Sequence, residues 1–267
     1  MHKLTLSLIA LSLASSAVAS EIHTIGNIAH SEQDDYQTTS IGITHYFDGR
    51  ETLGPIDKLS FINHSSSISG SYFNSDVSDG YGFAGTFIAD NGLLLGGALT
   101  KINYDDMGLA LGDFETRTLS AGYQGFEGFS IVTYYRDPDE GDSEITVAGQ
   151  YEHKLKGNDY IGLGVSIDED ADFINFTSEY FTDLGNGHFL QVNGQYVVND
   201  LGDDYWSAGG TYYLSEKSSV YATVGDDSFY SIGAKHFFTS NFALGISYAD
   251  SDNADEGLYS ALASVQF

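Results

Sequence analysis

The sequence predicts an all-β chain: a transmembrane, antiparallel, up-and-down β-barrel of about sixteen strands, with fourteen as the alternative count. The chain combines 31 Gly with 17 Phe and 19 Tyr but only 2 Pro, a mixture typical of strands. Segments of about ten residues, in which apolar side chains alternate with small or polar ones, recur about every fifteen residues. After the N-terminus, no stretch reaches the roughly 18 consecutive apolar residues of a membrane-spanning helix.

The N-terminus is expected to be a cleaved secretory signal. Met1-His2-Lys3 provides a short basic start, an apolar run follows, and Ala17-Val18-Ala19 forms a small-residue cleavage site. The apolar run is shorter than the roughly 20 residues that an anchoring helix needs. We therefore expect a signal peptide at residues 1–19 and a barrel at residues 20–267.

Each predicted strand has two chemically different faces. In one of them Ile161, Leu163 and Val165 alternate with Gly162 and Gly164. A soluble β-sandwich also alternates, but its exposed face is expected to be rich in charged residues. Here the second face is mostly Gly, Ser, Ala, Asn and Gln, which suits a water-filled lumen. The predicted strands are 22–30, 36–47, 65–74, 80–89, 93–104, 114–124, 129–136, 144–155, 160–168, 173–182, 188–198, 204–214, 218–225, 229–238, 242–250 and 257–267.

The predicted connections also separate into two kinds. Counted back from Phe267, alternate connections such as 137–143 and 169–172 are acidic, and they are expected to face outward from the cell. The other set contains tight turns such as Asp90-Asn91-Gly92, which suit short hairpins. Acidic loops on one rim and tight turns on the other predict a fixed orientation in a membrane.

One connection, from Asp48 to His64, is much longer than the other turns on its rim. It begins a candidate helix at Pro55 and spaces Ile56, Leu59 and Ile62 as one helical face. We expect a short helix at the mouth of the barrel. An inward fold that narrows the lumen, or a lengthened strand, are the alternatives.

The C-terminus carries a recognisable pattern. The last strand places Tyr259, Ala261, Ala263, Val265 and Phe267 on one face, and the chain ends on that aromatic. This segment resembles the last strand of Gram-negative outer-membrane barrels, whose terminal Phe is read by the assembly machinery. With the signal and the repeated strands, the whole sequence resembles a small outer-membrane porin.

The resemblance implies the location and the partners. It implies export to the cell outer membrane, contact with outer-membrane lipid and lipopolysaccharide, and the barrel assembly machinery as the partner that reads Phe267. It leaves a homo-oligomer open, because the acidic connections are too short for the long inward-folded constriction loop of general trimeric porins. The function it implies is passive diffusion of small hydrophilic solutes or ions, and the alternative is a non-conducting structural or surface-interaction barrel.

Composition and motifs argue against other function classes. The net charge of -28, with only 10 Lys and Arg, argues against a nucleic-acid partner. The absence of Cys excludes thiol catalysis and Cys-ligated metals. No nucleophile elbow, zinc-binding His pair or phosphate-binding glycine loop occurs, and the acidic run 168–172 lacks the spacing of a calcium loop. We therefore expect no enzyme, no cofactor and no metal; a barrel hydrolase is a distant third reading.

Polar residues on the second face are candidates to line a channel. Charged groups in a pore set its ion preference, although a wet lumen also accepts any polar side chain. The acidic outer connections predict a mild cation preference, which basic lumen residues would oppose. Arg117 is ambiguous, because Leu119 and Tyr123 share its parity. The candidates are Lys101, Asn103, Arg136, Gln150, Glu152, Glu179, Gln191, Asn193, Gln195 and Lys235.

Overall fold

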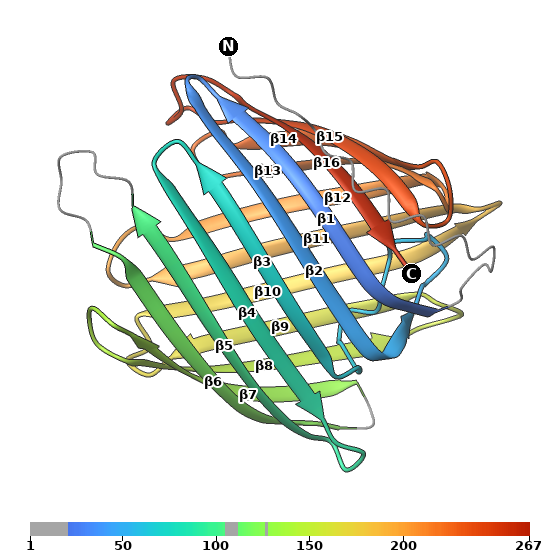
Figure 1. Ribbon diagram of the computed structural model, residues 1–267. Coiled ribbons are helices and arrows are strands. Elements are labelled where there is room, and N and C mark those ends of the chain that lie inside the picture. The colour runs from blue at the N-terminus through green and yellow to red at the C-terminus, as the bar shows by residue number, and fades with distance from the viewer. Residues whose placement is uncertain (1–20, 105–111, 126–127) are drawn as a thin grey trace.

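The computed structural model describes residues 21–104, 112–125 and 128–267, and it is a closed barrel (Figure 1). Each strand pairs antiparallel with the next, and β1 pairs with β16 to close the ring. The strands are β1 (Glu21–Gln33), β2 (Tyr36–Glu51), β3 (Ser67–Ser75), β4 (Ser78–Ile88), β5 (Leu93–Tyr104), β6 (Phe114–Gln124), β7 (Phe129–Pro138), β8 (Glu144–Lys154), β9 (Tyr160–Asp168), β10 (Phe173–Gly185), β11 (His188–Asn199), β12 (Tyr205–Ser215), β13 (Ser218–Gly225), β14 (Tyr230–Phe237), β15 (Phe242–Asp250) and β16 (Leu258–Gln266).

The predicted barrel is confirmed, with sixteen strands and every predicted strand present. Strand ends shift by a few residues, most at β1 and β2, which extend until only residues 34–35 connect them. The expected signal at residues 1–19 lies outside the described residues. No helix within the described ranges is long and apolar enough to cross a membrane.

The strand register gives the wall two faces, because residues directly opposite in an antiparallel pair share a face. Ile43, Gly70, Phe83 and Leu99 follow one another across β2–β5 on the outer face, where Phe83 is 60% exposed. The neighbouring row along the strands points into the lumen, and its side chains are small or carry a hydroxyl: Ser69, Ala84, Ala98 and Thr118. An apolar outside and a polar inside are the arrangement that a barrel in lipid requires.

The barrel closes at its C-terminus. Phe267 O accepts hydrogen bonds from the backbone N–H groups of His23 and Thr24, at 2.6 and 2.9 Å. Phe267 N–H donates in turn to Thr24 O at 2.9 Å. The register places Val265 opposite Gly26 on the outer face, so Phe267 has the same parity, as predicted.

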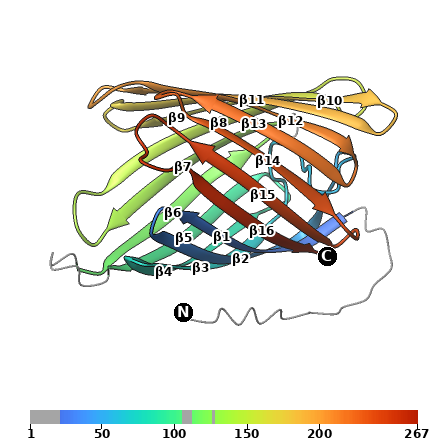
Figure 2. The ribbon, with the colours of Figure 1, turned by 90° about the horizontal axis from the view of Figure 1, so that it is seen from above.

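The connections lie at the two ends of the barrel (Figure 2). The two sets differ in length and in charge. We call the end with Phe267 the closing end and the other the loop end. The loop-end connections contain many Asp and Glu but no Lys or Arg. Six closing-end connections are five residues or shorter, whereas the one between β2 and β3 spans residues 52–66.

Candidate channel and the segment that crosses it

Residues 52–66, which we call the crossing segment, run through the inside of the barrel. The segment leaves β2 and returns to β3, yet Phe61 lies against Gly162 of β9, where an added Cβ would meet its ring at 2.6 Å. Strands β9 to β11 stand opposite β2 and β3 in the ring of sixteen. A connection between neighbouring strands can reach the opposite wall at this end only by crossing the lumen (Figures 1 and 2).

The expected helix at residues 55–62 is wrong, and the inward alternative is the one found. Lys58 N–H bonds to Pro55 O at 3.1 Å and Leu53 N–H to Lys58 O at 2.8 Å, while Thr52 pairs with Leu59. These contacts make a small hairpin-like loop. Gly54, at φ +124°, takes a backbone conformation that other residues rarely adopt. The wall supplies partners for several other backbone groups of the segment, such as Ile56 N–H and Phe61 N–H, in place of the bonds that a helix would provide.

The seat of the crossing segment is an aromatic cluster on the opposite wall. It consists of Tyr160, Phe181, Phe189 and Tyr213, and the side chains of Leu53 and Phe61 pack against it. Phe181, at the centre, is fully buried and stacks on Tyr160 and Phe189 at ring distances of 5.9 Å. Pro55 and Ile62 of the segment are also buried. The closing end of the lumen therefore has an apolar core, whereas the rest of the lumen is lined mainly by small or polar side chains.

Lys58 adds an ion pair to this seat. Its Nζ lies 2.7 Å from Glu179 Oε1, and both side chains are mostly buried. Tyr160 donates its hydroxyl to the same oxygen, and Gln191 Nε2 donates to Glu179 Oε2 at 2.6 Å. Three donors thus satisfy one carboxylate, and one of them belongs to the crossing segment. We call the Lys58–Glu179 pair the latch.

The crossing segment is also tied to the wall on both flanks. Glu152 of β8, which is buried, accepts the backbone N–H of Phe61 at 2.7 Å and that of Ile62 at 3.4 Å. On the other flank Lys235 of β14 pairs with Asp57 at 2.9 Å. Further bonds run from Ile56 N–H to the carbonyl of Glu216, from Gln266 to the carbonyl of Ile56, from Gln124 to the carbonyl of Asn63, and from Arg50 to Ser60. The segment therefore spans the mouth rather than hanging from one side.

His64, near the end of the crossing segment, makes a polar contact at the wall. Its Nδ1 lies 2.7 Å from Gln124 Nε2. Burial lowers the pKa of His64; the charge of Glu152 opposes this shift, and those of Lys154 and Arg50 add to it. The neutral imidazole is therefore the form that suits the seated segment.

Eight of the ten channel candidates lie on the lumen face. Three of them, Glu152, Glu179 and Lys235, hold the crossing segment and do not stand free beside a path. Gln150, Gln191, Asn193 and Gln195 are neutral, and Gln195 bonds to Asn175 at 3.0 Å. Arg136 faces Glu144 near the loop end, at 3.9 Å. Between the two ends, the lumen wall is mostly small or neutral.

Lys101 and Asn103 are corrections, because both lie on the outer face. Lys101 stands opposite Tyr81, two positions beyond Leu99 along β5, and shares the parity of that lipid-facing leucine. Its ammonium pairs with Asp113 at 2.8 Å. Arg117 shares this face and pairs with Glu115. The prediction placed both residues in the lumen, but they share the parity of Leu95 and Leu99, and these apolar side chains determine which face of β5 meets lipid.

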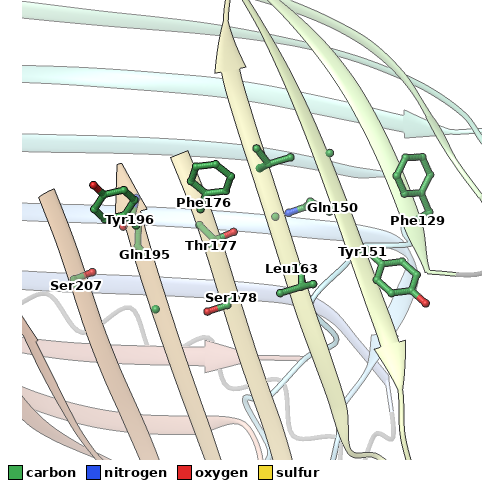
Figure 3. Close-up of a pocket in the computed structure, with 14 residues that line it drawn as sticks. Phe129, Gln150, Tyr151, Leu163, Phe176, Thr177, Ser178, Gln195, Tyr196 and Ser207 are labelled. Atoms are coloured by element: carbon green, nitrogen blue, oxygen red, sulfur yellow. The ribbon is translucent and has the colours of Figure 1, made fainter. Parts of the chain in front are cut away.

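A hollow of about 620 Å³ in the wall of β7–β12 is not the channel (Figure 3). It is framed mainly by outer-face side chains, among them Tyr151, Leu163, Phe176 and Tyr196. The hollow forms where small residues such as Gly149 and Gly194 leave space between the larger side chains of neighbouring strands. The hollow is mainly apolar and belongs to the lipid-facing surface.

Sequence reasoning missed the seat and the latch. Tyr160, Phe181, Phe189 and Tyr213 sit at inward positions of four adjacent strands near one end. Such a patch on an otherwise polar lumen face was the available signal that something apolar packs there. Lys58 offered no signal of its own, because its partner is 121 positions away in the chain.

Among the described residues, no group of His, Cys, Asp or Glu is arranged to hold a metal ion. A family model described as "Putative general bacterial porin" matches residues 1–267. Among solved structures, the chain resembles the outer membrane protein Omp33 of Acinetobacter baumannii at 17% identity and a TM-score of 0.58, over 93% of this chain and 99% of that one. It also resembles a triple mutant of the Rhodopseudomonas blastica porin at 13% identity and a TM-score of 0.53, over 92% and 99%.

No curated protein matches the chain. The structural likenesses, at such low identities, support the fold alone. The family model is the stronger finding, because it covers the whole chain and agrees with a closed barrel that is apolar outside and polar inside. The chain therefore belongs to the family of general bacterial porins, channel proteins of the outer membrane.

Proposed function

We propose that this porin lets small hydrophilic solutes and ions diffuse passively through its lumen, without a chemical step or a cofactor. The observation that carries the proposal is the lumen face between the two ends. It presents Gly, Ser, Thr and neutral amides such as Gln150, Asn193 and Gln195, which hydrate without binding a solute tightly. Such a surface favours passage over capture.

The proposed ion preference is a mild one for cations. The loop-end connections carry only acidic charge, so they concentrate cations at that mouth. This effect fades beyond a Debye length of roughly 8 Å at physiological salt. Arg136 opposes it from the lumen side of the same end, although Glu144 stands beside it.

The proposed partners follow from the surface. The apolar outer face is suited to outer-membrane lipid, and the acidic loop end to divalent cations that bridge it to lipopolysaccharide. Phe267 is proposed as the residue that the barrel assembly machinery reads during insertion. A homo-oligomer remains a proposal that cross-linking in membranes can test.

A second candidate, a barrel that does not conduct, is favoured by one observation. The crossing segment spans the closing end and is bonded on both flanks, which obstructs the path there. Such a barrel would act through its surface.

Single-channel recording in planar bilayers separates the two candidates. The samples are the folded full chain, a variant lacking residues 53–62, and a membrane without protein. Diffusion through the lumen predicts current from the full chain, and its reversal potential in a salt gradient reports the ion preference. Current from the deletion variant alone would favour the non-conducting barrel. Silence from both, with heat-modifiable gel migration showing both folded, would contradict the proposed function and favour the non-conducting barrel.

A further inference from the structure

We propose that the crossing segment is a displaceable gate at the closing end, that it sets the size limit of the channel, and that the Lys58–Glu179 latch holds it in place. The inference deepens the proposed function and rests on it. The element that limits solute size would then be a connection at the closing end. The loop-end connections would only supply negative charge at the opposite mouth.

The first argument is the conformation of the segment. Thr52 and Leu59 form an isolated bridge, and the segment has no helix and no regular strand pairing beyond it. Glycines in the left-handed region lie just before the segment and within it: Gly49 of β2 at φ +68° and Gly54 at φ +124°. The barrel is closed by its own strand ladder from β1 to β16, so leaving the lumen costs no ladder bond between strands. The segment can therefore move as a unit while the wall stays intact.

The second argument is the chemistry of the seat. Apolar contacts alone would stabilise a permanently fixed plug at least as well, since a buried ion pair adds little stability over well-packed hydrophobic residues. The contact between the segment and the wall also includes five charged residues beside the apolar seat: Lys58, Asp57, Glu152, Glu179 and Lys235. Such groups are satisfied in both states: by each other when the segment is seated, and by lumen water when it is displaced. Polar wall groups at a contact of this kind suit reversible docking.

The third argument is how the contacts are distributed. The apolar seat holds the middle of the segment through Leu53 and Phe61 on one wall only, at β9–β12. The latch lies at the edge of that same cluster, with Lys58 Nζ 5.4 Å from the Tyr160 ring and 5.8 Å from that of Phe181. Removing the charge of Lys58 leaves Glu179 without its cation and loosens the cluster together with the ion pair. A change of Lys58 is therefore expected to shift the segment outward.

The test compares conductance and solute size limit across four proteins. These are the full chain, the variant lacking residues 53–62, Lys58→Met, and the control Arg117→Gln, which removes an outer-face ion pair with Glu115. Conductance is recorded in planar bilayers, and the size limit is measured by swelling of liposomes in sugars from monosaccharide to trisaccharide. Removing the segment should raise conductance several-fold and admit larger sugars. Lys58→Met should raise the fraction of time spent at that higher level, and Arg117→Gln should match the full chain.

Further outcomes keep the gate separate from the channel. Equal conductance and equal size limits for the full chain and the deletion variant would overturn the gate while leaving passive diffusion standing. Silence from both folded proteins would overturn both. If the deletion variant fails to fold, Lys58→Met decides alone: wild-type gating in that variant would overturn the latch. Rescue by the charge swap of Lys58→Glu with Glu179→Lys, measured as a return to the wild-type open fraction, would support it.

Discussion

The two ends of the barrel use carboxylates in opposite ways. At the loop end, Asp76 accepts the backbone N–H of Gln37 at 2.7 Å and Asp139 that of Glu115 at 2.9 Å, so acids join neighbouring hairpins at a wet rim. Hydrogen bonds from the Tyr196 hydroxyl, the larger effect, and from the N–H of Asn199 keep the pKa of Asp204 below its usual value. At the closing end, Glu152 and Glu179 instead accept donors from a segment inside the lumen.

The difference lies in where water is. An acid at the rim is solvated, and its hydrogen bonds add local order at little cost, so substitution there changes little. A buried acid loses that solvation and must be fully bonded by protein, so each of its partners becomes important. The same side-chain type therefore gives a tolerant rim at one end and a specific seat at the other. The predictions below test this contrast.

The largest effect is expected from deleting Phe267. Deletion removes the N–H and C=O that bond to His23 and Thr24, each bond worth about 0.5–1.5 kcal/mol net, and it removes an aromatic from the interface. Outer-membrane yield, measured by immunoblot of membrane fractions, should fall strongly. Deleting residues 140–142 in a loop-end connection is the control, and it should leave the yield near wild type. Equal yields would show that the C-terminus does not direct assembly.

A large effect is also expected at Phe181, and strand β10 provides its own control. Phe181 lies at the closing end and is fully buried. Phe173 lies on the same face near the loop end and is 42% exposed. Phe181→Ala leaves a cavity in a packed cluster and should cost about 3–5 kcal/mol, as in soluble cores. Phe173→Ala should cost much less. Denaturant unfolding in detergent measures both, and cleavage within residues 52–66 by added protease reports whether the segment has loosened.

The sequence predicted the wall far better than it predicted the interior. Strand period and turn chemistry are local, so residues such as Ile161 to Ile167 and Asp90-Asn91-Gly92 specify strands and hairpins without reference to the rest of the chain. The crossing segment depends on partners more than a hundred positions away, and Pro55 with Ile56, Leu59 and Ile62 fits a helix as well as a turn. The predicted lumen position of Lys101 was wrong for a different reason. Lys101 shares the parity of Leu95 and Leu99, and these leucines place that face of β5 on the outside of the barrel.

A moderate effect is expected on ion selectivity when Arg136 becomes Gln. Arg136 is the lumen-face cation near the acidic loop end, so its loss should raise the cation preference at low salt. Lys101→Gln is the matched control, because Lys101 lies on the outer face and pairs with Asp113. Reversal potentials across a salt gradient measure both. An equal response to the two changes would mean that long-range charge, rather than position in the lumen, sets the preference.

The smallest effect is expected from pH, through His64 at the closing end. Because burial lowers its pKa, the seated segment prefers the neutral ring, while a displaced His64 has a pKa near the ordinary value of about 6.5. Seating is therefore fully supported above that value and loses support as pH falls below it, since the displaced state then binds a proton that the seated state resists. The charged groups around the ring, Glu152, Lys154 and Arg50, act in both directions, with Glu152 alone favouring the proton.

As pH is lowered below about 6.5 at constant ionic strength, the open fraction of the full chain should rise modestly. His64→Gln keeps a hydrogen-bonding side chain beside Gln124 but cannot titrate, so its open fraction should stay level over the same range. The reversal potential, measured in the same recordings, serves as an internal reference for the charge of the loop end, and it should be the same in the full chain and in His64→Gln. A pH response that persists in His64→Gln would assign the titration to another group and remove His64 from the closing-end mechanism.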